Sequence, residues 1–489
     1  MRNRLLIVCV SLLLAACTIG PDYVRPTIAT QPNWRLDYEA AAGLADAAWW
    51  EQFGDPVLDD LIDTALRENL DLQIAAARVD QYLGQLQTTR AEFFPQIGAG
   101  ASASRTDDTD TGLIPGNNSP YNYYQGTVNA TWELDLWGRI RRANEAARAE
   151  LLASEEGRRA VLLSLTANTA SAYIVLRGFD RQLEIARATE AAYAESLRIF
   201  RLRHQYGTVS QLEVSQVESQ YEVARQAIPQ YQAAVTRSEN LLNVLLGRTP
   251  GPIPRGKTID ELGVPGIPAG LPSELLTRRP DIVQAEQQLI AANARIGVAR
   301  ALYFPRVSLT GAFGTASIHS DQLFEGPSQV WQLSGDLLAP IFTFGAIEGQ
   351  VKAAEAQQRQ ALFSYRQTIL NAFRDTENAL VNTTKGREQL VAQTRQVGAL
   401  ETYARLARLQ YEAGRTAYLQ VLDADRALFS GQLSQVQTQA NTLGALIDVY
   451  RAMGGGWIDV ADQRSLQAST VTTPGEAAPA RAEGPTDRP

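Results

Sequence analysis

The sequence contains very few of the residues from which metal centres, disulfide frameworks and nucleophilic active sites are built. Its 489 residues include two histidines and two cysteines. His204 and His319 lie in unlike settings, and neither has a serine or cysteine nucleophile pattern beside it. A glycine-rich phosphate-binding loop is also missing. We therefore expect no catalytic residues, no metal site and no cofactor, and an enzyme is the disfavoured class of protein.

A concentration of positive charge is the second missing feature. Lys and Arg number 45 against 53 Asp and Glu, which gives a net charge of −8. No cluster of basic residues interrupts this mild acidity, and nucleic acid is therefore not an expected partner. Energy for any transport would have to come from another protein, because the chain has no nucleotide-binding motif.

The amino terminus reads as an export signal. Two arginines precede an apolar run at residues 5–14, which is too short to span a bilayer as a mature helix. The Leu-Ala-Ala-Cys that follows resembles the bacterial lipobox. It implies removal of residues 1–16 and a mature Cys17 that carries S-diacylglycerol and an N-acyl chain. Thr18, in place of aspartate, implies sorting to the outer membrane. An ordinary signal with a chance cysteine is the alternative.

Two long proline-free stretches, residues 139–206 and 346–413, predict helices far longer than those of an ordinary soluble domain. At 1.5 Å per residue each helix would be roughly 100 Å long. In the first stretch, apolar or small residues recur at alternating steps of three and four, which indicates a supercoiled helix with one apolar seam. The seam consists of Leu162, Leu165, Thr169, Ala172, Leu176, Phe179, Leu183 and Ala186.

Four other stretches alternate between apolar and polar residues, as a β-strand with two unlike faces does. They are residues 96–104, 126–136, 306–315 and 330–338. Strands of about ten residues with this pattern match those that cross an outer membrane. Tyr121, Tyr123 and Tyr124 end the polar loop between the first two strands, where interfacial aromatics are expected. A soluble hairpin is the alternative for each pair.

The second half of the chain repeats the first. Tyr303-Phe304-Pro305 answers Phe93-Phe94-Pro95, and Gly414 follows Gly207 by 207 residues. A shorter helix (71–91; 281–301) precedes each strand pair. A returning helix (209–246; 416–453) follows each long one, with a bend expected at Pro229. The expected segments are a signal peptide (1–16), a lipidated tether and equatorial segment (17–56), a first repeat (57–246), a Gly/Pro linker (247–272), a second repeat (273–453), and a C-terminal equatorial segment with a disordered tail (454–489).

Four strands are too few to close a membrane barrel, and the smallest single-chain barrels use about eight. Open strand edges are not tolerated in lipid, because their backbone groups would have no hydrogen-bond partners. The chain must therefore assemble with copies of itself. The fold class is mixed α+β: a long α-helical coiled-coil tunnel plus a transmembrane β-barrel shared between protomers, with two structural repeats in each chain.

Specific motifs add a family resemblance that covers nearly the whole chain. They are Trp49-Trp50-Glu51-Gln52-Phe53, Leu245-Leu246-Gly247, Leu275-Leu276-Thr277-Arg278-Arg279-Pro280-Asp281-Ile282 and Met453-Gly454-Gly455-Gly456-Trp457. These motifs resemble the outer-membrane factor family, in particular its lipoprotein branch that serves multidrug efflux pumps of the resistance-nodulation-division type. The resemblance implies a homotrimer in the cell outer membrane that reaches into the periplasm. It also implies a periplasmic adaptor and an inner-membrane pump as partners, and a passive exit duct for small molecules such as drugs.

The same resemblance implies a gate, because the family's tunnel closes just beyond the turn of the second half. Leu419 and Asp423 match positions that project into the constriction, and Arg426 matches one that helps to hold it shut. Their spacing places all three on one helix face. The alternatives are a seam leucine for Leu419 and a solvated surface pair for the other two. Some members carry a second carboxylate where this chain has Gln420, so a second acidic ring is left open.

The equivalent positions of the first half are Leu212, Gln216 and Ser219, so only the second half carries charges there. The turns between the long and returning helices are where members of the family meet their adaptor. The residues expected at these tips are Gly207, Thr208, Val209, Ser210, Gly414, Arg415 and Thr416.

Two other functions fit part of the pattern. A structural coiled-coil lipoprotein without a pore would explain the long helices, although it leaves the two amphipathic strand pairs unexplained. The same channel could serve type I secretion of proteins or peptides instead of efflux of small molecules. The sequence does not identify the transported substrates, nor which adaptor and pump are the partners.

Overall fold

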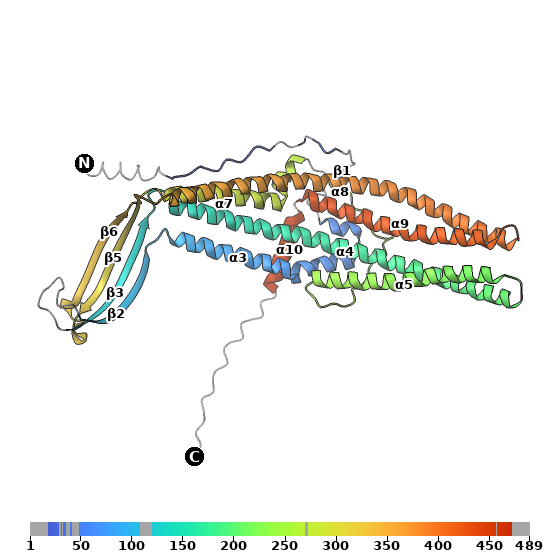
Figure 1. Ribbon diagram of the computed structural model, residues 1–489, viewed down its shortest axis with the longest axis horizontal. Coiled ribbons are helices and arrows are strands. Elements are labelled where there is room, and N and C mark those ends of the chain that lie inside the picture. Colours follow the sequence, from blue (N-terminus) through green and yellow to red (C-terminus); the bar gives the residue numbers. More distant parts are fainter. Residues whose placement is uncertain are drawn as a thin grey trace, which may run out of the picture. The chain divides into compact units, whose positions relative to one another are not determined.

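A computed structural model of the chain describes residues 18–28, 31, 33–35, 40–41, 48–107, 120–268, 272–455 and 457–471 (Figure 1). The chain divides into two compact units. The first comprises Met1–Ala29, Ala75–Arg158 and Pro280–Leu370, and the second comprises Thr30–Ile74, Arg159–Arg279 and Asn371–Pro489. Two long helices, α4 (Arg139–Gln205) and α8 (Ala346–Glu412), contribute residues to both units.

The first unit contains an antiparallel four-stranded sheet. Its strands lie in the order β2-β3-β5-β6, so each half of the chain supplies one hairpin. The bounds are β2 Gln96–Thr106, β3 Tyr121–Leu134, β5 Arg306–Ser317 and β6 Gln329–Leu338 (Figure 1). Among the described residues, β2 and β6 each have one neighbouring strand, so both outer edges of the sheet are open.

The sheet separates apolar from polar side chains. Residues directly opposite one another on neighbouring strands point to the same face. One row across all four strands is apolar and consists of Ala99, Val128, Phe313 and Trp331. The next row, on the opposite face, consists of Gly98, Asn129, Ala312 and Gln332. Phe313 and Trp331 are 61% and 77% exposed, so the apolar face is uncovered in the single chain.

The strand β3 differs most from its predicted bounds of 126–136. It begins at Tyr121 because the tyrosines assigned to the loop pair with β2, Tyr121 opposite Thr106 and Tyr123 opposite Ser104. Aromatic residues favour such paired positions. The strand ends at Leu134, because the Asp135 carboxylate accepts hydrogen bonds from the backbone N–H groups of Ile140 (3.0 Å) and Arg141 (2.9 Å) and so caps α4.

The other helices are α2 Pro56–Glu68, α3 Leu70–Ala91, α5 Gln211–Leu245, α6 Leu275–Arg278, α7 Pro280–Ala301, α9 Tyr418–Met453 and α10 Trp457–Val471. The long helices α4 and α8 each end one residue earlier than expected, and the returning helices α5 and α9 each begin two residues later. The α5 helix continues through Pro229.

The second unit has an aromatic core that the sequence reading missed in part. Trp49 and Trp50 in the 3-10 helix η1 (Trp49–Phe53) are fully buried, as is Trp457 at the start of α10. The indole of Trp457 meets both tryptophans edge to face, with ring centres 6.0 and 5.9 Å apart. Within the segment expected as a C-terminal equatorial segment with a disordered tail (454–489), residues 457–471 therefore form an ordered helix. The remaining tail, 472–489, lies outside the described residues.

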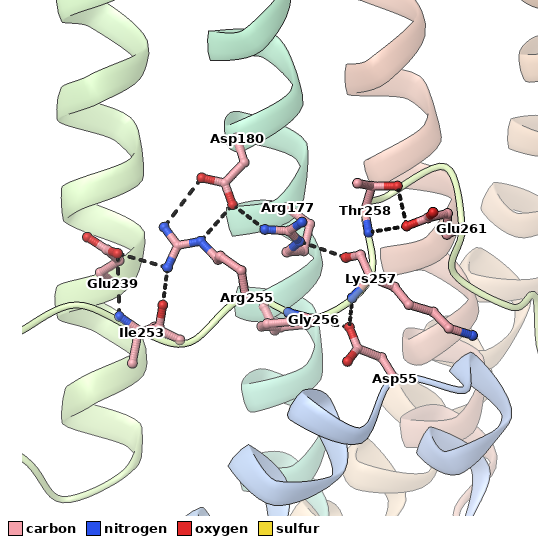
Figure 2. A network of polar contacts seen from close by, with 11 residues as sticks. Asp55, Arg177, Asp180, Glu239, Ile253, Arg255, Gly256, Lys257, Thr258 and Glu261 are labelled. Atoms are coloured by element: carbon pink, nitrogen blue, oxygen red, sulfur yellow. Dashed lines mark hydrogen bonds and ion pairs between the residues drawn. The ribbon is translucent and has the colours of Figure 1, made fainter.

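The Gly/Pro segment expected as a linker at 247–272 is held by a polar network (Figure 2). The buried Asp55 carboxylate accepts hydrogen bonds from the backbone N–H of Lys257 (3.0 Å) and the hydroxyl of Tyr173 (2.8 Å). Arg255 bridges Asp180 of α4 (2.8 Å) and Glu239 of α5 (2.9 Å). The short strand β4 (Ile267–Pro268) also pairs with β1 (Ala40–Ala41). The described part of this segment, residues 247–268, is thus a fixed part of the second unit, because side chains far away in the sequence satisfy its backbone.

Candidate functional site at the helix tips

The two turns that join the long and returning helices have the same backbone hydrogen bonds. After α4, the N–H of Gly207 donates to the carbonyl of His204 (2.8 Å), and that of Thr208 donates to Arg203 (3.0 Å). The turn after α8 repeats both bonds 207 residues later. Gly207 and Gly414 have φ angles of 69° and 68°, a left-handed conformation that glycine adopts at helix ends.

The seven predicted tip residues all lie in these turns, and only Val209 and Thr416 are partly covered. The two turns differ in how the returning helix begins. The Ser210 hydroxyl accepts a hydrogen bond from the N–H of Glu213 (3.3 Å), and the Glu213 carboxylate accepts one from the N–H of Ser210 (2.8 Å). This capping box has no counterpart in the other turn, where Ala417 is the N-cap residue of α9.

Beneath the turns, an aromatic cluster joins the two helical hairpins. The ring centre of Tyr418 in α9 lies 4.2 Å from the ring centre of Phe200 in α4 and 5.0 Å from that of Tyr411 in α8. A guanidinium nitrogen of Arg203 donates to the Tyr411 hydroxyl (3.2 Å). Burial raises the pKa of Tyr418 to about 12, so its hydroxyl is neutral at any physiological pH. The cluster fixes the hairpin ends against each other.

The predicted gate residues meet their first-half equivalents in one groove of about 310 Å³. The groove between α5 and α9 is lined by Leu212, Ser215, Gln216, Ser219, Gln220, Leu419, Leu422, Asp423 and Arg426. Leu419 is 61% exposed, whereas Leu422 is buried in the hydrophobic core. The buried position that Leu419 would hold as a seam leucine is thus occupied by Leu422.

The two charged residues of the predicted gate form an ion pair on the α9 surface. The Arg426 guanidinium lies 3.0 Å from the Asp423 carboxylate, and their side chains are 65% and 55% exposed. Tyr403 of α8 was missed by the sequence reading. Its hydroxyl accepts a hydrogen bond from Gln420 (3.1 Å) and lies 3.5 Å from the Asp423 carboxylate. Gln420, the position at which a second acidic ring was left open, therefore acts as a hydrogen-bond donor to Tyr403.

A second acidic residue of α9, Asp425, faces away from this groove. Its side chain is only 11% exposed and pairs with Arg408 of α8 at 3.1 Å. Burial raises the pKa of this carboxyl group, and the Arg408 charge partly opposes that rise. The sequence alone does not show that Asp425 is buried, because its burial depends on how α9 packs against α4.

The predicted lipidation site, Cys17, lies outside the described residues, but the segment after it is fixed to the first unit. The Ile19 N–H donates to the carbonyl of Trp137 (3.1 Å), and Asp22 pairs with Arg142 of α4 at 2.6 Å. The Glu286 carboxylate of α7 receives hydrogen bonds from Tyr23 (3.0 Å) and Arg25 (2.7 Å). Residues 19–25 of the expected tether are therefore held against the first unit by specific contacts.

Comparisons with known proteins agree with this geometry. The sequence profile described as outer membrane efflux protein matches residues 61–248 and 271–455, one block in each repeat. The solvent efflux pump outer membrane protein SrpC of Pseudomonas putida is 36% identical over 455 residues, which cover 91% of this chain and 97% of that protein. The cation efflux system protein CusC of Escherichia coli is 34% identical over 460 residues and covers 93% and 99% of the two chains.

The fold has close counterparts among solved structures. The open state of the MtrE outer membrane channel of Neisseria gonorrhoeae superposes with a TM-score of 0.82 at 31% identity, over 90% of this chain and 99% of that one. The family profile covers more than half of the sequence, and the relatives match it along almost their entire length. The chain belongs to the outer membrane efflux protein family.

Proposed function

We propose that this protein is the passive exit duct of a tripartite efflux system and carries small molecules from the periplasm to the cell exterior. The observation that carries this proposal is the sheet, which has one exposed apolar face, one polar face and two edges without a neighbouring strand among the described residues. Such a sheet is stable in a membrane only when its edges are paired and its apolar face meets lipid. The polar face would then line the water-filled pore.

A homotrimer satisfies these requirements. Three chains with four strands each would pool twelve strands, enough for a closed barrel, and their helices would continue as a tunnel. We infer that Asp423 and Arg426 close this tunnel at its periplasmic end, with one copy of each from every protomer. The groove that they share with Leu212 and Gln216 supports this role. Both charged side chains lie on the face of α9 that borders this groove, opposite the equivalent face of α5.

The partners follow from the family. We infer that the exposed tips around Gly207 and Gly414 receive a periplasmic adaptor, which connects the duct to an inner-membrane pump of the resistance-nodulation-division type. Relatives of similar identity are named for solvent efflux and for cation efflux. This range supports a duct that leaves substrate choice to the pump. The names of these relatives give no support to the protein-secretion alternative.

We also propose that Cys17 carries S-diacylglycerol and an N-acyl chain, with no other cofactor. A hydrogen bond and an ion pair hold Ile19 and Asp22 near the start of α4. The β3 strand ends only a few residues before α4, so these contacts keep the segment after Cys17 close to the membrane strands, which supports this anchor. A lipid attached there would sit at the same level as the membrane strands.

Planar-bilayer recording tests the proposed function. The full-length protein, purified from outer membranes, should have the mass of a trimer in native mass spectrometry and should conduct small ions after reconstitution. A monomer, or a trimer that never conducts even in gate variants, would favour a structural coiled-coil lipoprotein instead.

A further inference from the structure

Two tyrosines of β3, Tyr121 and Tyr123, lie on the polar face of the sheet. The register of β2 and β3 is continuous, so their side chains alternate strictly between the two faces. Tyr121 and Tyr123 lie opposite Thr106 and Ser104, on the same face as the polar row that contains Asn129. Within the four described strands, no other aromatic residue shares this face. The environment of these two rings therefore differs from that of the other aromatic residues of the sheet.

Contact with the membrane explains the aromatic residues of the apolar face. That face carries Tyr124, Trp132, Phe313 and Trp331. Aromatic residues are enriched on the lipid-facing side of membrane strands, at both borders of the bilayer. Tyr121 and Tyr123 face the other way, toward the pore of the proposed trimer. Contact with lipid therefore gives no reason for aromatic residues at these two positions.

Both tyrosines lie at the end of the sheet that is remote from the helices. The helices α3 and α4 connect to the sheet at Gln96 and Leu134, the first residue of β2 and the last residue of β3. Thr106 and Tyr121 form the opposite end of this strand pair. In the proposed duct the helices extend into the periplasm, so this end is the outer mouth of the pore. Each tyrosine is 37% exposed in the single chain, so a molecule in the pore can reach its ring.

The charged residues in the strand connections at this mouth are acidic. Asp107 directly follows β2, and Asp321 and Glu325 lie in the connection between β5 and β6. All three residues are exposed. The described part of these two connections contains no lysine or arginine. The basic residue near this end of β2, Arg105, has a register that places it on the apolar face. The mouth of the pore is therefore a region of negative potential, which favours cations.

We propose that Tyr121 and Tyr123 of every copy form an exit site for organic cations at the outer mouth of the pore. The inference rests on the proposed duct and adds a class of small molecule that its pore would bind. A cation over the face of an aromatic ring is attracted by the ring quadrupole, and proteins recognise quaternary ammonium ligands in this way. The carboxylates of the strand connections would raise the local concentration of cations, and the rings would select the organic ones among them.

Weak binding at this place suits an exit duct. A channel has to bind what it conducts well enough to admit it and weakly enough to release it. One exposed ring changes the affinity for a cation by only about two- to fivefold. The residues opposite the two rings, Ser104 and Thr106, are uncharged and cannot add an ion pair. The exit site would therefore hold an organic cation briefly and release it to the exterior.

Block of single channels by tetraethylammonium tests the exit site. The full-length trimer is reconstituted in a planar bilayer, and the probe is added first to one side and then to the other. We expect block from the side of the strand connections. In the double variant Tyr121→Ala and Tyr123→Ala, the half-blocking concentration should rise about tenfold. The matched control is Tyr124→Ala, which removes the adjacent tyrosine from the opposite face and should leave the block unchanged.

Two further measurements separate the ring from the charge. The double variant Tyr121→Phe and Tyr123→Phe should keep the wild-type block by tetraethylammonium, because the attraction to a ring needs no hydroxyl group. Block by Mg²⁺, which sheds its water shell reluctantly, should not change in the alanine variant. Equal block by tetraethylammonium in the wild type and the alanine variant, or a loss of block in the phenylalanine variant, would overturn the exit site while leaving the proposed function intact. A protein that never conducts would overturn both.

Discussion

Removal of the Asp423 carboxylate is the most direct test of the proposed gate. The pair with Arg426 lies within α9 and is exposed by more than half on both sides. We expect the contacts that these charges make with neighbouring copies in the closed state to be equally exposed and therefore worth only about 0–1 kcal/mol for each copy. In a trimer three copies act together, so Asp423→Ala could shift the equilibrium between closed and open by up to about 3 kcal/mol, or roughly 100-fold. Salt screens exposed charges, so the shift should shrink as ionic strength rises.

Single-channel recording would measure this shift. Asp423→Ala and Arg426→Ala should each raise the resting conductance, and multivalent cations should block the wild-type channel more strongly than Asp423→Ala. The matched control is Glu195→Ala, which breaks an exposed pair with Arg198 at the same i, i+3 spacing on α4, outside the gate groove. Wild-type conductance and wild-type cation block in both gate variants would refute the reasoning and make Leu419 the next candidate.

Four further outcomes are expected. Bulky substitution of Gly207 or Gly414 forces a left-handed φ on a residue with a Cβ, so efflux should fall while the trimer persists; loss of the trimer would assign these glycines to folding. Cys17→Ser should abolish incorporation of labelled fatty acid and slow signal processing. Trp457→Ala should cost about 3–5 kcal/mol and expose α10 to limited proteolysis, and a protected α10 would contradict this. Burial, reinforced by nearby carboxylates, raises the pKa of Asp59 to about 6, so folding stability is lost as pH rises from about 4 to 6. Asp59→Asn should therefore raise the melting temperature at pH 7.5 and have little effect at pH 4.

The parts of the fold that depend on periodicity could be predicted from the sequence. The alternation around Val128 and Phe313 gives each strand its two faces, and the same residues lie opposite one another in the sheet. The absence of proline from 139–206 predicted a helix that the structure ends at Gln205. Local turn chemistry also gave the positions of Gly207 and Gly414, because a left-handed residue is needed where a helix ends.

The parts that depend on contacts between distant residues could not be predicted. Composition alone made 247–272 a linker, although Asp55 and Arg177, far away in the sequence, satisfy its backbone. The helix α10 is weakly marked in the sequence, and burial of Trp457 against Trp49 is what holds it. Within the candidate site, Tyr403 was missed because it sits on the other helix of the hairpin, where no pattern links it to Asp423.

The unequal caps of the two returning helices have a consequence for motion. Ser210 and Glu213 tie down the first turn of α5, whereas the first turn of α9 starts from Ala417 with no side-chain cap. A cap of this kind is worth about 1 kcal/mol, so the first amides of α9 should open roughly five times more often than those of α5. In a hydrogen-exchange experiment on the full-length protein, we expect faster labelling at Leu419 and Gln420 than at their equivalents Leu212 and Glu213. The hairpin that carries the charges of the proposed gate is thus also the one whose end unwinds at lower cost.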